Sequence, residues 1–235
     1  VQWAEHLPHG FEGLVLANEV LDALPVHLVA WRGADVHERG VSVEKSRFVF
    51  SDRPIEPGEL LDLARSISPG NDYVSEICLP ARGLVRSLAQ ALARGAILLI
   101  DYGFGHREYY HPQRSRGTLM CHYRHRAHDD PLFLPGLQDI TAHVDFTAIA
   151  QAGIEAGLSL LGYTTQAHFL INCGITELLA EAPAGDVAAY VPLAAQAHKL
   201  LSPAEMGELF KVMALGRGAG QPLLGFGRGD MSRLL

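Results

Sequence analysis

The sequence is poor in cysteine and has no excess of positive charge. Its three cysteines, Cys78, Cys121 and Cys173, lie far apart and form no C-x-x-C pair. A scattered, odd-numbered set of this kind favours reduced thiols in a cytosolic compartment over a disulfide framework. Lysines and arginines total 19 against 26 aspartates and glutamates, so the formal net charge is -7. Because nonspecific nucleic-acid binding requires a basic surface, we expect no nucleic-acid partner.

Long apolar runs are also missing. No run approaches the roughly 18–20 residues that cross a bilayer, so we expect no membrane span. The chain opens Val1-Gln2-Trp3 without an initiator methionine, and its first residues do not have the pattern of a signal peptide. We therefore expect that residues are missing upstream.

Glycine-rich motifs that bind phosphate are incomplete. Gly103-x-Gly105 follows a predicted strand, but Glu108 replaces the third glycine of a dinucleotide fingerprint. A nicotinamide-dependent oxidoreductase is therefore disfavoured. The sequence contains neither a Walker A motif nor a G-x-S-x-G elbow.

The chain does contain two short apolar runs that are separated by a clear helical pattern. Residues 13–18 and 96–103 predict buried strands. Residues 79–94 predict a helix, with Pro80 in its first turn and Gly95 just after its end. Strand, helix and strand in this order are typical of a parallel βαβ unit, so we expect an α/β fold.

Polar side chains follow both predicted strands. Asn18 and Glu19 end the first strand, Asp22 lies on the next turn, and Asp101 ends the second strand. In open α/β sheets this edge holds the ligand site, so we expect Glu19 and Asp101 to lie at a common site. The alternative for Glu19 is a carboxylate that caps the following helix.

Further elements are expected along the rest of the chain. Residues 26–53 predict antiparallel hairpins, and residues 104–135 predict a long polar loop beside the active site, with one short strand near residues 117–123. Residues 174–210 are expected to be mainly helical. Helices are predicted at 59–66, 145–156, 175–182, 187–201 and 203–209, and strands at 158–161, 165–171, 210–215 and 223–226.

Histidines are frequent in the polar segment. A metal site is one interpretation, but the spacing of His122, His125 and His128 suits neither a helix nor a strand that gathers all three, so we expect no metal. Further on, His143 and Asp145 either belong to a strand and a capped helix or lie near the site.

Several segments in order resemble the MidA family. The central match is Ala17-Asn18-Glu19-Val20-Leu21-Asp22-Ala23-Leu24-Pro25-Val26-His27. Further matches are Asp101-Tyr102-Gly103, Arg116-Gly117-Thr118-Leu119, Pro135-Gly136, Asp139 to Phe146, Gln166, Phe169-Leu170, Asn172, Gly174-Ile175, Leu201, Pro203, Met206-Gly207 and Phe210-Lys211. The resemblance covers nearly the whole chain.

The resemblance implies a class I methyltransferase that depends on S-adenosylmethionine and has a Rossmann-like sheet. Compared with the family, the chain starts just before the fourth strand. Residues 1–235 would therefore form the C-terminal, substrate-side part of one methyltransferase domain. The upstream strands that bind most of the cofactor, with their glycine-rich loop, are expected to be absent.

The same resemblance, together with the chemistry of carboxylates, suggests roles for the site residues. Carboxylates hold and orient a guanidinium group, which is always charged. Glu19 and Asp22 are the predicted catalytic carboxylates, and His143 is a candidate for relaying the released proton. Asn18 and Glu19 are also expected to contact the cofactor. The predicted substrate-binding residues are Asn18, Asp101, Tyr102, Gly103 and Asp145.

The family implies a protein arginine as methyl acceptor, on a subunit of respiratory complex I. The competing interpretation is a catalytically silent assembly factor that binds a protein partner. The expected compartment is the cytoplasm in a bacterium and the mitochondrial matrix in a eukaryote. The oligomeric state stays open, with a homodimer among the alternatives.

Overall fold

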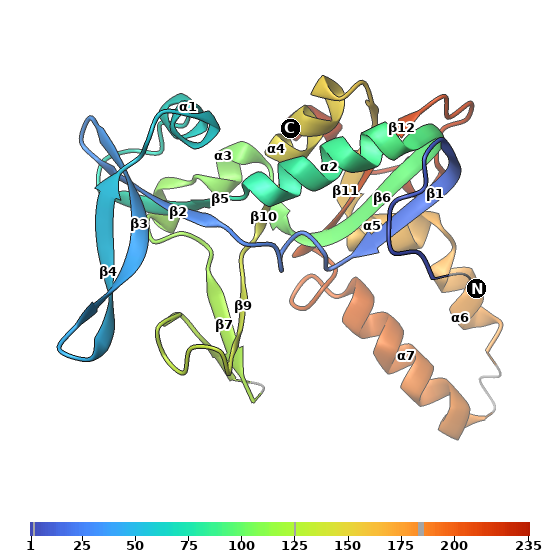
Figure 1. The fold of residues 1–235 in the computed structure, drawn as a ribbon. Helices are drawn as coiled ribbons and strands as arrows, with labels where there is room; N and C mark the ends of the chain where they lie inside the picture. The colour runs from blue at the N-terminus through green and yellow to red at the C-terminus, as the bar shows by residue number, and fades with distance from the viewer. Residues whose placement is uncertain (2, 125, 183–185) are drawn as a thin grey trace.

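The centre of the molecule is a mixed β-sheet (Figure 1). The computed structural model describes residues 1, 3–124, 126–182 and 186–235. The sheet order is β1 (Phe11–Asn18), β6 (Leu92–Phe104), β12 (Phe210–Arg217) and β11 (Ser159–Thr165), and β10 (Val144–Asp145) pairs with the end of β6. Strands β1 and β10 run parallel to β6, whereas β12 runs antiparallel to both β6 and β11. The expected α/β fold class is therefore confirmed.

The predicted βαβ unit is present, with a different boundary. Helix α2 (Leu79–Ala91) connects the two parallel strands and has Pro80 in its first turn, as expected. It ends three residues before the predicted end. Gly95, expected just after the helix, lies inside β6 with a φ of +135°, where an added Cβ would stand 1.9 Å from the Gly13 carbonyl oxygen. This glycine is needed for the close approach of β1 and β6.

Strand β1 is in the predicted place, but it is not buried. Val15 and Ala17 pack partly against the core, whereas Leu14 and Leu16 on the opposite side are 58% and 61% exposed. Alternate side chains point to opposite faces of a strand, and β1 has one neighbour, β6, among the described residues. The continuous apolar run was therefore a correct sign of a strand and a wrong sign of burial.

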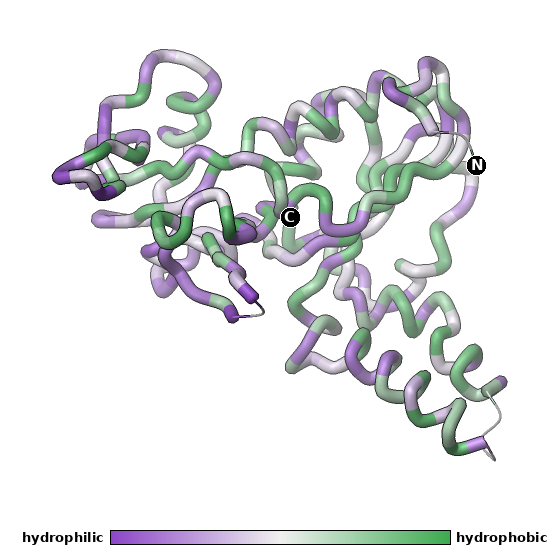
Figure 2. Tube along the Cα trace, turned by 60° about the horizontal axis from the view of Figure 1, so that its bottom comes forward, coloured by the Kyte–Doolittle hydropathy of each residue, from purple (hydrophilic) through white to green (hydrophobic). Residues whose placement is uncertain are grey.

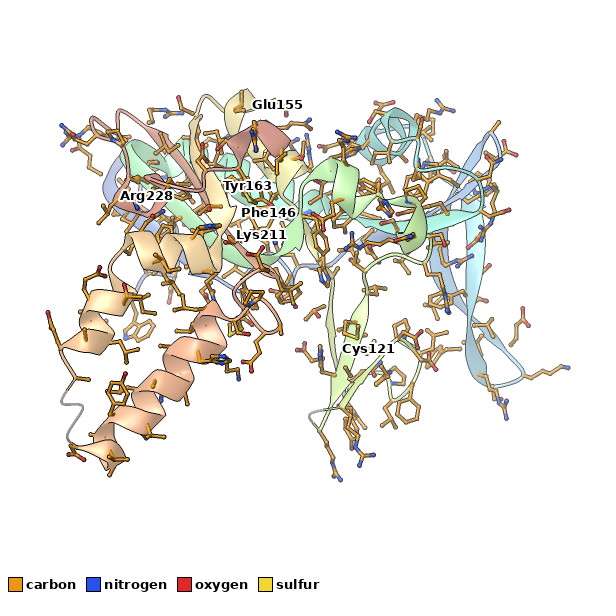
Figure 3. The ribbon with its side chains drawn as sticks, turned by 180° about the vertical axis from the view of Figure 1, so that it is seen from behind. Cys121, Phe146, Glu155, Tyr163, Lys211 and Arg228 are labelled. Atoms are coloured by element: carbon orange, nitrogen blue, oxygen red, sulfur yellow. The ribbon has the colours of Figure 1, made fainter. Side chains whose placement is uncertain are left out.

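Helices cover both faces of the central sheet. Helix α2 and helix α4 (Phe146–Glu155) pack on one face. Helix α5 (Gln166–Asn172) and a short 3-10 helix, η2 (Leu224–Phe226), cover the other. The hydrophobic colour that follows the central strands in Figure 2 agrees with this burial. Figure 3 shows Phe146 and Tyr163 close together near the centre, and their ring centroids are 5.3 Å apart.

Two strand predictions in the C-terminal part are wrong. Residues 165–171 were expected to form a strand, but β11 ends at Thr165, whose side chain accepts a hydrogen bond from the His168 backbone N–H and starts α5. Residues 223–226 form η2 rather than a strand. Short apolar runs do not distinguish helix from strand by periodicity alone.

A second, antiparallel sheet stands beside the central one. Its order is β4 (Arg47–Pro54), β3 (Asp35–Glu44), β2 (His27–Arg32) and β5 (Tyr73–Ile77). The hairpins expected between residues 26 and 53 are present, and β5 is an addition that the sequence did not reveal. Helix α1 (Glu59–Ser66) lies where it was predicted and packs on one face of this sheet, where the Trp31 indole donates to the Ala64 carbonyl.

The segment predicted as a long polar loop with one short strand contains more structure than expected. It contains helix α3 (His106–Tyr109), the 3-10 helix η1 (Pro112–Arg114), and strands β7 (Met120–Tyr123) and β8 (Arg126–His128), which join β9 (Asp139–Thr141) in a three-stranded sheet. His125, part of the histidine pattern, lies outside the described residues. The short strand expected near residues 117–123 is present as β7, whereas the other elements were not expected. Strand β7 pairs with β8 inside the segment and with β9 beyond it.

Two helices project from the body near the C-terminal part of the chain (Figure 1). They are α6 (Ile175–Ala180) and α7 (Val187–Leu201), of which α7 has its predicted bounds. The helix predicted at 203–209 is a series of turns, closed by the Gly207 N–H donating to the Ser202 carbonyl, and η3 (Ser232–Leu234) ends the chain. Residues 183–185 of the expected helical segment lie outside the described part. No helix among the described residues is long and apolar enough to cross a bilayer.

Candidate functional site at the end of β1 and β6

The structure brings the predicted carboxylates to one edge of the sheet. Asn18 pairs with Ile100 across the two parallel strands, so Glu19 and Asp101 follow at the same level. The Glu19 backbone N–H donates to the Ile100 carbonyl oxygen at 2.9 Å, and its φ is +50°. A non-glycine residue in this left-handed region is strained, and such strain concentrates at functional sites. The Glu19 side chain is exposed, and the Asn18 amide donates to it at 3.4 Å.

Asp101 holds the turn that follows β1. Its side chain is 1% exposed, and its carboxylate accepts backbone N–H donors from Leu21 at 3.0 Å, Asp22 at 3.3 Å and Tyr102 at 2.9 Å. Burial, and then the nearby charge of Asp22, raise the pKa of Asp101 to about 7. These contacts fix the position of the turn that carries Glu19 and Asp22. Direct binding of substrate by Asp101 stays a prediction.

Asp22 has one oxygen occupied and one available. Its Oδ2 accepts a hydrogen bond from the Tyr102 hydroxyl, whereas its buried Oδ1 has no partner among the described residues. Burial, and then the hydrogen bond to Asp22, raise the pKa of Tyr102 and keep its hydroxyl protonated as a donor. Because a buried carboxylate oxygen without a donor is costly, this atom is a natural point for a ligand N–H to bind.

His143 lies next to the hydrogen-bonded pair of Asp22 and Tyr102. Its ring stacks on Phe104 with centroids 5.2 Å apart and meets Tyr102 edge-on at 5.1 Å. Its backbone N–H donates to the Thr118 hydroxyl at 3.1 Å, and its buried Nδ1 has no partner among the described residues. Burial, and then the charge of Arg114, lower the pKa of His143 to about 4. The imidazole is therefore neutral at physiological pH and has a free ring nitrogen.

The lowered pKa of His143 predicts a loss of stability in acid. The folded protein keeps this ring neutral down to about pH 4, whereas an ordinary imidazole takes up a proton near pH 6.5. Between these values the unfolded state binds more protons, so the free energy of unfolding decreases as the pH falls from 6.5 through 4. We expect wild type to lose about 3 kcal/mol more than His143→Gln between pH 7 and pH 4 in urea unfolding.

The matched control for this titration is His6→Gln, at an exposed histidine near the start of the chain. This variant should keep the full pH dependence of wild type. Equal slopes for wild type and His143→Gln would contradict the assignment.

Glu76 is a buried residue near His143 that no pattern in the sequence indicated. Glu76, on β5, is 2% exposed, and its carboxylate accepts from the Thr118 and Leu119 backbone N–H groups and from the hydroxyls of Thr118, Ser75 and Tyr109. Its partners lie in the Arg116-Gly117-Thr118-Leu119 segment, which was noted as a motif. Thr118 thus links Glu76 to the backbone of His143.

Two other predicted site residues have clear local roles. Gly103 allows β10 to approach β6, since an added Cβ would stand 2.1 Å from the Val144 carbonyl oxygen. Asp145 is the N-cap of α4, as predicted, and accepts from the Thr147 and Ala148 N–H groups at 3.1 and 3.2 Å. Its other oxygen lies 3.3 Å from His106 Nδ1, which raises the pKa of His106. Substrate binding by Gly103 and Asp145 stays a prediction.

Two cavities meet at His143. One, of about 890 Å³, extends past Lys211 and the first turn of α4, and the other, of about 640 Å³, lies between the second and third sheets. Asn18 and Glu19 line neither cavity, so they face the open side of the sheet edge. In the part of the chain that the structure describes, no group of three His, Cys, Asp or Glu side chains is placed to hold a metal ion.

The parallel pair of β1 and β6, with polar groups at its carboxyl edge, is the arrangement of a Rossmann-like α/β protein. The family described as "Putative S-adenosyl-L-methionine-dependent methyltransferase" matches residues 1–164. The chain belongs to this family.

Similar proteins support the assignment over nearly the whole chain. Protein arginine methyltransferase NDUFAF7, mitochondrial, from Mus musculus is 33% identical over 229 residues, which cover 92% of this chain and 49% of the relative. The protein of the same name from Danio rerio is 32% identical and covers 90% of this chain and 49% of its own length. The chain therefore spans about half the length of these curated relatives.

A solved structure is closer in sequence. A protein from Burkholderia thailandensis that is described as a likely methyl transferase, in a crystal structure bound to S-adenosyl-homocysteine, is 53% identical and superposes with a TM-score of 0.95. The match covers 100% of this chain and 61% of that one. The cofactor of this structural neighbour is thus of the class that the resemblance implies.

Proposed function

We propose that this protein transfers a methyl group from S-adenosylmethionine to an arginine guanidinium of a protein substrate. The observation that carries the proposal is the exposed Glu19 carboxylate, held in a left-handed conformation at the end of β1. The hydrogen bonds that the turn makes to Ile100 and Asp101 hold the backbone in this strained conformation. The names of the arginine methyltransferase relatives and the homocysteine derivative in the structural neighbour support it.

The residues of the turn suit both the cofactor and the acceptor. The exposed Asn18 amide would contact S-adenosylmethionine on one side, which leaves the Glu19 carboxylate for the acceptor, and the unpartnered Asp22 Oδ1 is a position for an N–H donor. When bound, the cofactor supplies an electrophilic methyl group. Glu19 would hold the guanidinium through charge-assisted hydrogen bonds and orient one nitrogen, while its negative charge stabilises the positive charge that persists through the transfer.

His143 is the candidate for the released proton. Its Nδ1 is unpaired among the described residues, and its lowered pKa keeps the ring neutral but also makes it a weak base, so it would hold the released proton only in passing. Phe104 and Tyr102 hold the ring in place, and their aromatic faces limit water around it. The ring is thus positioned to pass a proton between the turn and the two cavities that it lines.

The partner and compartment follow the relatives in this proposal. The acceptor would be a protein arginine, on a respiratory complex I subunit as the resemblance implies. The curated relatives carry the word mitochondrial in their names, which supports the mitochondrial matrix for a eukaryotic protein and, by analogy, the cytoplasm for a bacterial one.

The direct test uses methyl-labelled S-adenosylmethionine with full-length protein and a lysate from cells that lack the gene. We expect label in protein-bound methylarginine, and calorimetry should show binding of S-adenosylhomocysteine. The present chain and a version extended upstream should be compared in the same titration, because the extension is expected to supply most of the cofactor contacts. Cofactor binding without any labelled protein would instead support a catalytically silent assembly factor.

A further inference from the structure

The antiparallel sheet has one covered face and one that is only partly covered. Side chains alternate between the faces of a strand, and the strand register shows which ones share a face. Val29 and Trp31 point toward α1. The opposite face therefore carries Leu28 of β2, with Arg39 and Asp52 beside it in register on β3 and β4. At the β5 side of this face, the segment from Arg114 to Leu119 lies against Glu76.

The far end of the same face is apolar and open. Val41 pairs with Phe50 across β3 and β4, and Val43 pairs with Phe48. The four side chains, which we call the hairpin patch, are 56%, 41%, 66% and 50% exposed in that order. Four large apolar side chains gathered on one exposed hairpin are typical of an interaction site.

The hairpin displays the patch in a fixed register. Lys45 and Ser46 form its two-residue turn, and both have positive φ angles, of 47° and 62°. This geometry is that of a type I′ turn, which matches the twist of the flanking strands. Figure 1 shows β3 and β4 standing apart from the central sheet, on the side where β7 and β9 also extend.

The hairpin patch continues into the cavity of about 640 Å³ that leads to His143. Phe50 belongs to the patch and also lines this cavity, together with Arg39 and Leu28 of the same face. Phe104 and His143 line it as well, and these are the rings that stack beside the candidate site. One continuous surface thus connects the hairpin to the proton-accepting side of the site.

Arginines line this cavity, which we call the arginine groove. Arg32, Arg39, Arg114 and Arg116 all contribute to its wall. Arg39 is held by Asp52 at 2.7 Å, whereas Arg32 stands 3.7 Å from both Asp52 and Asp72. The highly exposed Arg116 stands 3.9 Å from Asp129. Direct charge-assisted hydrogen bonds are about 2.7–2.9 Å long, so Arg32 and Arg116 can exchange these loose partners for an acidic group of a ligand.

We propose that the hairpin patch and the arginine groove together bind the polypeptide that accepts the methyl group. This inference rests on the proposed function. The bound segment presents apolar side chains to Val41, Val43, Phe48 and Phe50, an acidic side chain to Arg32 and Arg116, and its acceptor arginine to the site beyond His143. The order of these groups along the surface defines the substrate class as a protein with an apolar and an acidic element on one side of the arginine.

The continuity of the surface selects this occupant over a small molecule or a second copy of the chain. A small ligand fills a cavity of this size without reaching the hairpin tip, so it leaves the apolar patch unexplained. A second copy covers the patch but gives no reason for the patch to open into a groove lined by His143. A polypeptide substrate uses the whole surface and brings its arginine to the side of the site where His143 lies.

The test is a kinetic comparison with full-length protein. The acceptor is the protein fraction of a lysate from cells lacking the gene, freed of small molecules and titrated by total protein, with labelled S-adenosylmethionine as donor. Val43→Thr combined with Phe48→Thr removes apolar surface and places threonine, which favours strands, at both positions of the exposed hairpin. We expect the apparent KM for acceptor protein to rise at least tenfold, with kcat within twofold of wild type.

A matched control is Leu178→Thr, on α6, where the leucine is 66% exposed and distant in sequence from the groove. It should leave KM unchanged, and all variants should keep the wild-type melting temperature and affinity for S-adenosylhomocysteine. Arg116→Gln should raise KM more at low salt than at high salt.

The outcomes separate this inference from the proposed function. An unchanged KM in the double variant overturns the inference while leaving methyl transfer intact. A double variant that dissociates a dimer without changing KM also overturns it, because a second copy then covers the patch. Absence of methylarginine with wild-type protein refutes the proposed function and removes the basis of the inference.

Discussion

Glu19→Gln in the full-length protein is expected to lower methyl transfer by more than tenfold, on the order of a hundredfold, while the affinity for S-adenosylhomocysteine changes little. The carboxylate and the amide have the same shape, so the variant removes the negative charge and leaves the turn in place. A guanidinium that must be held and oriented loses one charge-assisted pair. Initial rates at saturating cofactor and a calorimetric titration measure the two quantities.

The control for this result is Glu12→Gln, near the other end of the same strand. Glu12 is exposed and pairs with Arg94 at 3.0 Å. It carries the same charge as Glu19 but lies at the opposite end of β1, away from the candidate site. This variant should keep wild-type turnover. A Glu19→Gln enzyme with unchanged turnover would exclude Glu19 as the group that holds the acceptor.

A third variant separates the charge of Glu19 from its backbone strain. Glycine adopts a φ near +50° without the steric cost that glutamate has there, so Glu19→Gly should fold at least as stably as wild type. Its turnover should nevertheless fall as much as that of Glu19→Gln. This result would show that the protein keeps a strained backbone at residue 19 because the reaction needs the glutamate side chain there.

The sequence predicted this sheet edge because the signals for it are local. An apolar run, a helix with a proline in its first turn and a second apolar run specify the parallel pair of β1 and β6, and the register follows from it. The same local signals could not predict that Leu14 and Leu16 are exposed. Burial depends on which element packs against the outer face and edge of β1, and an apolar run contains no information about that neighbour.

The place of Asp101 shows the same difference. Its position at the end of β6 was predicted, but its partners are backbone N–H groups of residues about 80 positions earlier. Any residue type carries such a donor, so no pattern in the sequence marks the contact. A strand-end carboxylate therefore indicates the edge of the sheet without showing whether it faces a ligand or anchors the neighbouring turn.

Glu76 is the clearest example of a buried residue whose role could not be predicted from the sequence. It lies in a strand that was not predicted, and its Thr118 and Leu119 donors come from a segment about 42 residues further along the chain. The one available sign is Gly117. Its φ is +80°, and an added Cβ would stand 2.3 Å from Glu76 Oε1, so only glycine lets the motif wrap around this carboxylate.

Glu76→Ala is expected to lower the free energy of unfolding by at least about 4 kcal/mol, because it leaves one buried and one partly buried backbone N–H group and three hydroxyls without their acceptor. Glu76→Gln is the matched control. Its carbonyl oxygen can still accept from the Thr118 and Leu119 N–H groups, and its NH2 can donate to hydroxyls that rotate to accept. We expect this variant to lose no more than about 2 kcal/mol in urea unfolding.

The same pair of variants tests whether Glu76 positions His143. Glu76 holds Thr118, and the Thr118 hydroxyl accepts the His143 backbone N–H. At a temperature where both proteins are folded, Glu76→Ala should reduce kcat and bring the pKa of His143 back toward 6.5, since a loosened segment admits water to the ring. NMR titration of the imidazole measures this shift. A destabilised Glu76→Ala variant in which His143 keeps its wild-type pKa would show that Glu76 supports only the fold. The proposed positioning of His143 by Glu76 through Thr118 would then be refuted.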